Sequence, residues 1–127
     1  MYSNKIVPIN RLKKLILYLK KKGKKIVFTN GCFDILHCGH VSYLSKAKQL
    51  GDILIIGINS DSSVKSIKSK KRPINKLKNR MYMLSSLECI DYISSFNQVT
   101  PYKLIKQIPF MSNPVRILIN WCILLRC

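Results

Sequence analysis

Two histidines three residues apart are the side chains best placed to do chemistry. They lie in the segment His37-Cys38-Gly39-His40, which follows a short apolar run and begins a helical pattern. Residues three apart share one face of a helix, so both imidazoles would meet the same ligand. An imidazole can donate a hydrogen bond to a phosphate oxygen, and a protonated one stabilises developing negative charge. Because Gly39 lets the backbone approach a ligand closely and the start of a helix suits an anion, we predict a phosphate site here.

A metal site is the main alternative for the same segment. Cys32, His37, Cys38 and His40 are four potential ligands within nine residues. Zinc sites more often take ligand pairs from two separated segments, and Cys38 would point away from the histidine face. Purely structural histidines are a further alternative, and a cysteine nucleophile is disfavoured because nothing requires a covalent intermediate. We therefore predict no metal held by the protein alone.

Alternating helical and strand patterns place these residues in an α/β fold. The predicted helices cover residues 10–22, 40–50, 77–87 and 101–108, and the predicted strands cover 25–30, 53–58 and 90–96. Residues 59–75 are polar and basic and are predicted to form a long loop. This order indicates a Rossmann-like three-layer architecture, a parallel sheet with helices on both faces. Right-handed crossovers would bring Asn30-Gly31, Asn59-Ser60-Asp61 and Phe96-Asn97 to one edge of the sheet, where ligands bind.

The charge is strongly positive, with 23 Lys and Arg against 5 Asp and Glu and a net charge of +18. Nucleic acid, a membrane surface or phosphate substrates would each suit such a charge. Coding bias explains it more simply, since Lys, Ile and Asn are all abundant and most of the cations are Lys rather than Arg. A basic nucleic-acid-binding module is the alternative from another functional class. Scattered aromatic residues offer no stacking platform, so nucleic acid is not the expected partner.

Cysteine usage and hydropathy favour the cytoplasm. The five cysteines form an odd set without paired spacing, and Met1 to Pro8 does not resemble a secretory signal. The longest apolar tract, Val115 to Leu125, is interrupted by Arg116 and Asn120 and is shorter than the roughly 20 residues that span a bilayer. We therefore expect a cytoplasmic protein with reduced thiols and no membrane partner.

Residues 26–44, IVFTNGCFDILHCGHVSYL, resemble the cytidylyltransferase-like superfamily, whose members share an H-x-G-H motif. More narrowly, the chain resembles the stand-alone adenylyltransferases that make ADP-heptose for the lipopolysaccharide inner core. The resemblance covers roughly residues 10–109 and is supported by the ordered segments Leu50-Gly51-Asp52, Asn59-Ser60-Asp61, Arg72-Pro73-Ile74-Asn75, Asn79-Arg80-Met81, Leu87-Glu88-Cys89-Ile90-Asp91 and Thr100-Pro101.

The resemblance implies that a sugar 1-phosphate attacks the α-phosphate of ATP, with Mg²⁺ assisting and pyrophosphate leaving. It implies catalytic roles for His37, His40, Lys68 and Arg80, nucleotide binding by Asn30, Gly31, Cys32, Phe33, Gly39 and His40, and substrate binding by Asp61 and Arg72. Asp34 would brace its loop. From the residues alone, Asp61 is also a common turn former and Lys68 lies in a solvated charge run. A cytidylyltransferase acting on glycerol 3-phosphate is the alternative within the class, and a homodimer is possible.

The tail is predicted to differ from the family. The resemblance stops after Pro109, and residues 111–127 lack the glycine-rich turn and the later Ser/Thr-rich loop that the family has. We expect a nucleotidyltransferase domain at residues 1–110 and a divergent tail at 111–127, produced by a frameshift or a premature stop. The tail would form either an irregular fourth strand or foreign sequence, with the family's last strand and helix missing or altered.

Overall fold

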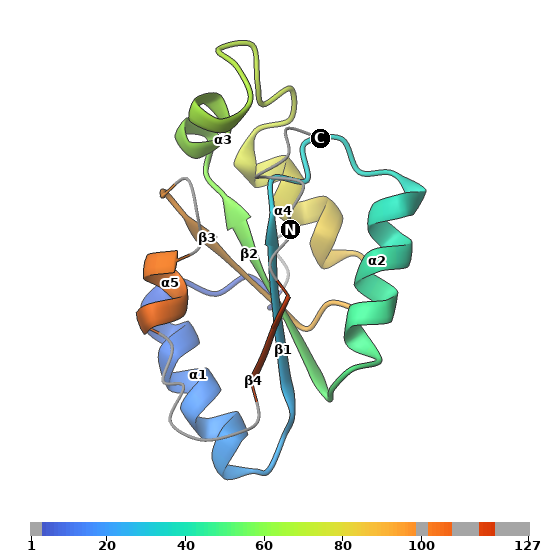
Figure 1. The fold of residues 1–127 in the computed structure, drawn as a ribbon, viewed down its shortest axis with the longest axis vertical. Helices are drawn as coiled ribbons and strands as arrows, with labels where there is room; N and C mark the ends of the chain where they lie inside the picture. The colour runs from blue at the N-terminus through green and yellow to red at the C-terminus, as the bar shows by residue number, and fades with distance from the viewer. Residues whose placement is uncertain (1–3, 99–101, 108–114, 119–127) are drawn as a thin grey trace.

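Four parallel strands form the centre of the chain in a computed structural model that describes residues 4–98, 102–107 and 115–118. The strands are β1 (Ile26–Gly31), β2 (Ile53–Asn59), β3 (Tyr92–Phe96) and β4 (Val115–Leu118), in the order β3-β2-β1-β4 (Figure 1). The helices are α1 (Ile9–Lys21), α2 (Cys38–Lys48), α3 (Asp61–Ile67), α4 (Leu77–Ser85) and α5 (Tyr102–Gln107). The predicted parallel α/β fold is confirmed.

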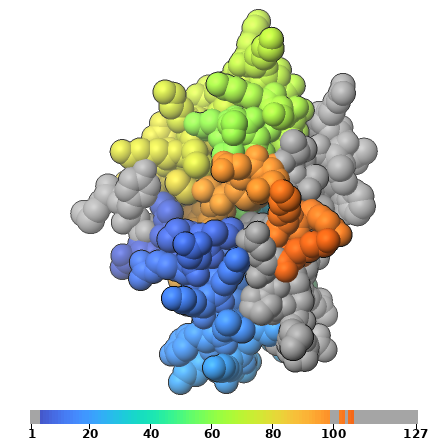
Figure 2. All heavy atoms as spheres, turned by 90° about the vertical axis from the view of Figure 1, so that its left-hand side faces the viewer, coloured from blue at the N-terminus to red at the C-terminus, as the bar shows by residue number. Residues whose placement is uncertain are grey.

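Helices cover both faces of the sheet, as the alternation of buried residues along each strand requires. On one face Val27 packs with Leu44 of α2 and Leu84 of α4. On the other face Phe28 packs with Ile16 of α1. Figure 2 shows this second face, where α1 and α5 lie below the green segment that includes α3. The result is the predicted three-layer arrangement.

The order of the strands places a switch point beside β1. Strands β1, β2 and β3 follow one another across the sheet, whereas β4 pairs with the opposite side of β1. In open α/β sheets, ligands bind beyond the carboxyl ends of the strands where the order reverses. The loop that leaves β1 therefore lies where this fold favours a ligand.

The predicted long loop at 59–75 is wrong for residues 61–67, which form α3. The Ser60 hydroxyl caps this helix by accepting a hydrogen bond from the Ser63 N–H at 3.3 Å. Val64 is fully buried and holds the helix against the body of the fold. Its serine-rich sequence offers too few apolar residues for a helical period, so tertiary packing decides the structure here.

Strand β4 comes from the predicted tail, so residues 115–118 of that tail extend the sheet next to β1. The rest of the tail lies outside the described residues, as do Thr100 and Pro101 at the start of the last predicted helix. The boundary at residue 110 and the frameshift stay predictions. Within the described residues, no helix has both the length and the apolar character that crossing a bilayer requires.

Candidate active site at the end of strand β1

The loop after β1 takes a tight path that depends on Gly31 and Phe33. Phe33 is buried and has a φ of 48°, an uncommon conformation for a residue other than glycine. A Cβ atom on Gly31 would lie 2.6 Å from the Phe33 ring, so only glycine leaves room for that ring. The Phe33 ring then meets the His40 ring edge-on, with 5.3 Å between centroids. Strain of this kind is characteristic of ligand-binding loops.

The two predicted histidines lie together at the start of α2. His37 is the N-cap residue, and its Nδ1 accepts a hydrogen bond from the Gly39 N–H at 3.1 Å. In return His40 Nδ1 accepts from the His37 N–H at 3.3 Å. The rings stack with centroids 3.8 Å apart and 25° between their planes. These reciprocal bonds form a capping box made of imidazoles, and they fix the orientation of both rings.

Gly39 has a second role besides the one predicted from the sequence. A Cβ atom at this position would lie 2.8 Å from His37 Cε1 and 3.0 Å from His37 Nδ1. Any other residue would therefore make the His37 ring shift from the position in which it reaches both the Gly39 N–H and the His40 ring. The glycine of the motif is needed for the ring geometry itself.

The hydrogen bonds also define what the imidazoles offer to a ligand. Because each Nδ1 accepts a backbone N–H, the proton of each neutral ring resides on Nε2. Burial, and then repulsion from His37 and Lys68, lowers the pKa of His40 below its ordinary value. At neutral pH His40 is thus a neutral donor through Nε2–H, rather than the protonated group that the sequence also allowed. His37 is exposed and His40 half-buried, so a ligand can reach the pair.

The metal alternative does not find support in the geometry. Among the residues that the structure describes, no three His, Cys, Asp or Glu side chains gather to hold a metal ion. Cys32 is buried, whereas Cys38 is exposed. Burial raises the pKa of the Cys32 thiol, and the positive charges of Lys68 and Arg80 offset this only in part. A protonated, buried thiol is also a poor nucleophile.

Asp34 braces the loop as predicted, by binding a segment 38 to 41 residues away. Its carboxylate accepts hydrogen bonds from the N–H groups of Ile74 (3.0 Å) and Asn75 (2.9 Å) and pairs with Arg72 at 2.9 Å. Burial alone would raise the pKa of Asp34, but these bonds hold it below its ordinary value. Arg72, predicted to bind substrate, is therefore engaged with Asp34, although 37% of its side chain remains exposed.

Arg80, predicted to neutralise phosphate, is fully buried. Its guanidinium donates to the carbonyl oxygens of Asn75, Cys32 and Asn59 at 2.9, 2.8 and 2.7 Å. It also pairs with Asp61 at 2.7 Å. Asp61 Oδ1 accepts the Leu77 N–H as well, so this predicted substrate residue caps the start of α4 through one oxygen.

Lys68 lies on the histidine side of the site. It is exposed at the end of α3, and its positive charge contributes to the lowered pKa of His40 and opposes the rise that burial causes in the pKa of Cys32. Asn30 is buried at the end of β1. The predicted residues thus fall into two groups. Gly31, Phe33 and Gly39 shape the surroundings of the His37–His40 pair, and Lys68 acts on it by its charge. Arg72, Asp61 and Arg80 are engaged in ion pairs and hydrogen bonds that join distant segments of the chain.

Sequence reasoning missed two supporting contacts. Thr29, buried in β1, shares a 2.9 Å hydrogen bond between its hydroxyl and that of Tyr43 on α2. The Asn75 side-chain amide donates to the Asp34 carbonyl at 2.6 Å. A polar residue inside an apolar strand was a usable signal for Thr29. No local signal identifies Asn75, because its partner is 41 residues away.

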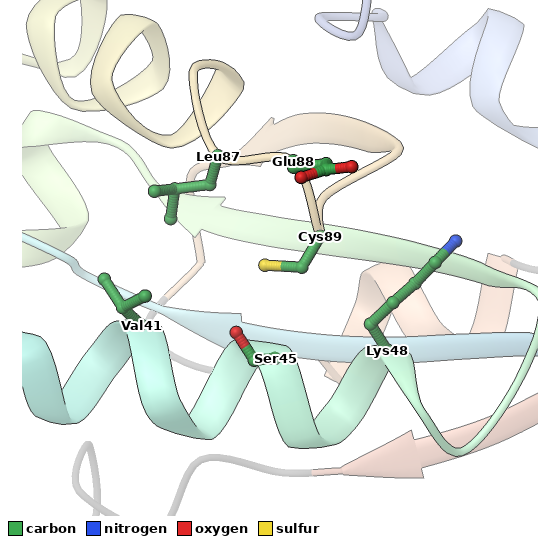
Figure 3. Close-up of a pocket in the computed structure, with 6 residues that line it drawn as sticks. All are labelled: Val41, Ser45, Lys48, Leu87, Glu88 and Cys89. Atoms are coloured by element: carbon green, nitrogen blue, oxygen red, sulfur yellow. The ribbon is translucent and has the colours of Figure 1, made fainter.

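Two surface cavities lie away from these residues. One, of about 460 Å³, lies between α2 and the segment that joins α4 to β3 and is lined by Val41, Ser45, Lys48, Leu87, Glu88 and Cys89 (Figure 3). The other, of about 610 Å³, lies beside α1 and is lined by Asn4, Ile6, Val7, Arg11, Lys14, Leu15 and Tyr92. Neither is lined by a predicted site residue.

Proteins of known name are similar to this chain in sequence. Residues 28–122 match the family model described as cytidylyltransferase-like. The chain is 64% identical over 88 residues to the bifunctional protein HldE of Nitratiruptor sp. and 59% identical over 106 residues to that of Helicobacter hepaticus. These alignments cover 69% and 84% of this chain but 19% and 22% of the relatives, so the chain spans about a fifth of their length.

A solved structure shows the same fold. The lipopolysaccharide core biosynthesis protein of Thermoplasma volcanium superposes with a TM-score of 0.62 at 23% identity, covering 76% of this chain and 96% of that one. At this identity the likeness supports the fold alone. The family-model match, by contrast, covers most of the chain and contains the histidine pair, Gly39 and the loop after β1. The chain belongs to the cytidylyltransferase-like family of nucleotidyltransferases.

Proposed function

We propose that this chain transfers an adenylyl group from ATP to a sugar 1-phosphate, with heptose 1-phosphate as the acceptor. A phosphate oxygen of the sugar forms a bond to the α-phosphorus of ATP, the bond from that phosphorus to the bridging oxygen breaks, and pyrophosphate leaves. ADP-heptose, a precursor of the lipopolysaccharide core, is the product. The single observation that carries the proposal is the stacked pair of His37 and His40, with two Nε2–H donors beyond the end of β1.

The imidazole pair suits phosphoryl chemistry because such transfer depends mainly on positioning and on charge stabilisation. His37 and His40 donate Nε2–H bonds to the triphosphate, where negative charge develops on the departing oxygen. The exposed Lys68 adds a positive charge from the neighbouring α3. Rings that are already oriented by the backbone need no reorganisation when the charge develops.

The nucleotide is proposed to bind along the loop that leaves β1. Asn30, Gly31, Cys32 and Phe33 line it through backbone groups, with Gly39 at the start of the helix. The tight packing of Phe33 on Gly31 supports this role, because a strained loop of fixed shape presents its backbone in one arrangement.

The acceptor is proposed to bind on the side of Asp61 and Arg72. Asp61 uses Oδ1 for Leu77 and Arg80, and its side chain is 39% exposed, which leaves Oδ2 for a sugar hydroxyl. Arg72 reaches solvent while it pairs with Asp34, so its guanidinium can also meet the sugar phosphate.

Mg²⁺ is proposed to arrive with ATP. The carboxylates of the site, Asp34 and Asp61, are engaged by Arg72 and Arg80, and the described residues form no cluster of ligands of their own. This donor set suits a cation that is held chiefly by phosphate oxygens and water, as Mg²⁺ commonly is. When bound, it neutralises charge on the triphosphate.

Pyrophosphate release tests the proposal. The purified chain is assayed with ATP and heptose 1-phosphate, with CTP and glycerol 3-phosphate, and with each nucleotide alone, beside a variant that carries both His37→Ala and His40→Ala. Release in the first reaction, lost in the variant, supports the proposal, whereas release only with CTP assigns the alternative acceptor. No release with either pair refutes it. Salt-dependent binding of RNA that survives the double substitution would instead favour the nucleic-acid module.

A further inference from the structure

Arg80 is the most completely engaged charged residue of the site. Its side chain has no exposed surface. A guanidinium has five N–H donors. Four hydrogen bonds use Nε, both N–H groups of one terminal nitrogen and one of the other. The positive charge is neutralised by Asp61 at 2.7 Å, and three carbonyl oxygens complete its surroundings.

These bonds join the segments on which the proposed site is built. Cys32 belongs to the loop after β1, Asn59 ends β2, Asp61 begins α3, and Asn75 precedes α4. The partners lie 48, 21, 19 and 5 residues from Arg80 in the chain. One side chain therefore sets the distance between the loop proposed to bind the nucleotide and the segment proposed to bind the acceptor.

Direct contact between Arg80 and a phosphate would be costly. The phosphate would have to displace a carbonyl oxygen or Asp61 from a buried cation, and the displaced group would lose its partner. Lys68 offers the opposite situation, since it is exposed and its charge reaches His40. Lys68 is thus suited to neutralise phosphate, whereas the geometry of Arg80 is suited to holding protein segments together.

We infer that Arg80 is a positioning residue: it ties the loop after β1 to the start of α3 and affects ATP binding through those segments, without contacting the phosphates. This inference rests on the proposed function. Among the described residues Arg80 is the only charged side chain that is fully buried, and its proposed role is to hold the ligand-binding loops in place.

Arg80→Lys separates placement from charge, because lysine keeps the positive charge but cannot donate in the planar fork that joins four segments. We expect its affinity for ATP with Mg²⁺, measured by titration calorimetry, to fall about tenfold or more. Amide exchange should rise at residues 31–36 and 59–63 and stay unchanged at 53–56 in the centre of β2. Lys76→Met, which removes an exposed cation at the start of the same helix, is the matched control and should leave both measurements unchanged.

Two results would overturn the inference. One is wild-type affinity in Arg80→Lys. The other is weakened ATP binding with unchanged amide exchange in both loops, as expected if Arg80 touched the phosphates directly. Should Arg80→Lys fail to fold, Asp61→Ala removes the hydrogen bond to the start of α3 and leaves the charge of Arg80 in place, so weaker ATP binding should again come with faster exchange at residues 59–63. If the wild-type chain binds no ATP, the proposed function fails, while the exchange data still decide whether Arg80 links the two loops.

Discussion

The histidine pair and the Arg80 network lie on either side of the same loop, yet they are built in opposite ways. The bonds that orient His37 and His40 span two or three residues and leave the rings accessible. The bonds of Arg80 reach up to 48 residues along the chain and are buried. The imidazole Nε2–H groups are left to bind a ligand, whereas the N–H donors of Arg80 bind other groups of the protein.

The histidine pair thus serves to contact a ligand, and the Arg80 network serves to hold the fold around the site. Each imidazole accepts one hydrogen bond within the first turn of its own helix, so its replacement leaves a single local N–H without that partner. A buried guanidinium bound to one carboxylate and three carbonyls is the reverse, because its loss leaves several polar groups without partners. Variants should therefore divide into those that harm activity alone and those that harm stability first.

Arg80→Ala should have the largest effect on stability. It leaves Asp61 and three carbonyl oxygens, two of them in buried hydrogen bonds, without their donor, so we expect the free energy of unfolding to fall by about 3–5 kcal/mol. Urea denaturation followed by circular dichroism measures it. Lys76→Ala, at the exposed start of the same helix, should stay within about 0.5 kcal/mol of wild type. Equal losses in the two variants would contradict the network as the source of stability.

His37→Ala and His40→Ala should lower activity much more than stability, in contrast to Arg80→Ala. Each removes an Nε2–H donor, and loss of one such donor typically lowers the rate about 10²–10³-fold. The melting temperature should fall only by the few degrees that loss of one helix cap costs, since the His37 ring is otherwise exposed. The rate of pyrophosphate release and thermal unfolding are measured in parallel, with Cys38→Ala as the control from the same turn. A variant that lost activity only because it unfolded would break the proposed separation.

Gly39→Ala tests the ring geometry without removing either histidine. The added methyl group would lie 2.8 Å from His37 Cε1, so the ring has to move. Misplacement of a reacting group by about 1 Å can cost about 10²-fold in rate. Alanine in a helix is favoured over glycine by roughly 0.5–1 kcal/mol, so stability should hold or rise while activity falls. Wild-type pyrophosphate release from this variant would show that the stacked arrangement is not needed.

Local patterns were enough to predict much of the fold. The three predicted strands were found at nearly their predicted residues, and the edge where Asn30-Gly31 and Asn59-Ser60-Asp61 meet follows from a parallel sheet alone. The histidine pair was readable because its members lie within one helical turn. Gly39 was recognised for the space it leaves, although the ring that fills this space was identified only from the structure.

Long-range contacts were not predictable in the same way. Arg80 was predicted to be catalytic, since nothing nearby in sequence shows that its partners are Cys32, Asn59 and Asp61. Helix α3 was missed because it is stabilised by a serine cap and one buried valine rather than by an amphipathic period. In both cases the deciding interactions join segments that the sequence does not show to be neighbours.

The smallest effect expected is a pH dependence of stability that arises from His40. The pKa of His40 in the folded chain lies below its ordinary value of 6.5, so the unfolded chain binds more protons as the pH falls through that range. Stability is therefore complete above pH 6.5 and declines as the pH falls below it. Urea midpoints measured between about pH 7.5 and pH 5 should decline less in His40→Gln than in wild type, because glutamine does not titrate.

The titration of Asp34 sets the lower limit of the pH range in which His40 can be studied alone. The pKa of its carboxyl is also lowered, so its contribution is present above its ordinary value of 3.8 and is lost only in stronger acid. A loss of stability above pH 5 is thus assigned to His40, and a loss of stability below pH 4 to Asp34 and its hydrogen bonds. Identical slopes for wild type and His40→Gln above pH 5 would mean that the imidazole pair is as accessible to protons in the folded chain as in the unfolded one, against its half-buried packing on Phe33.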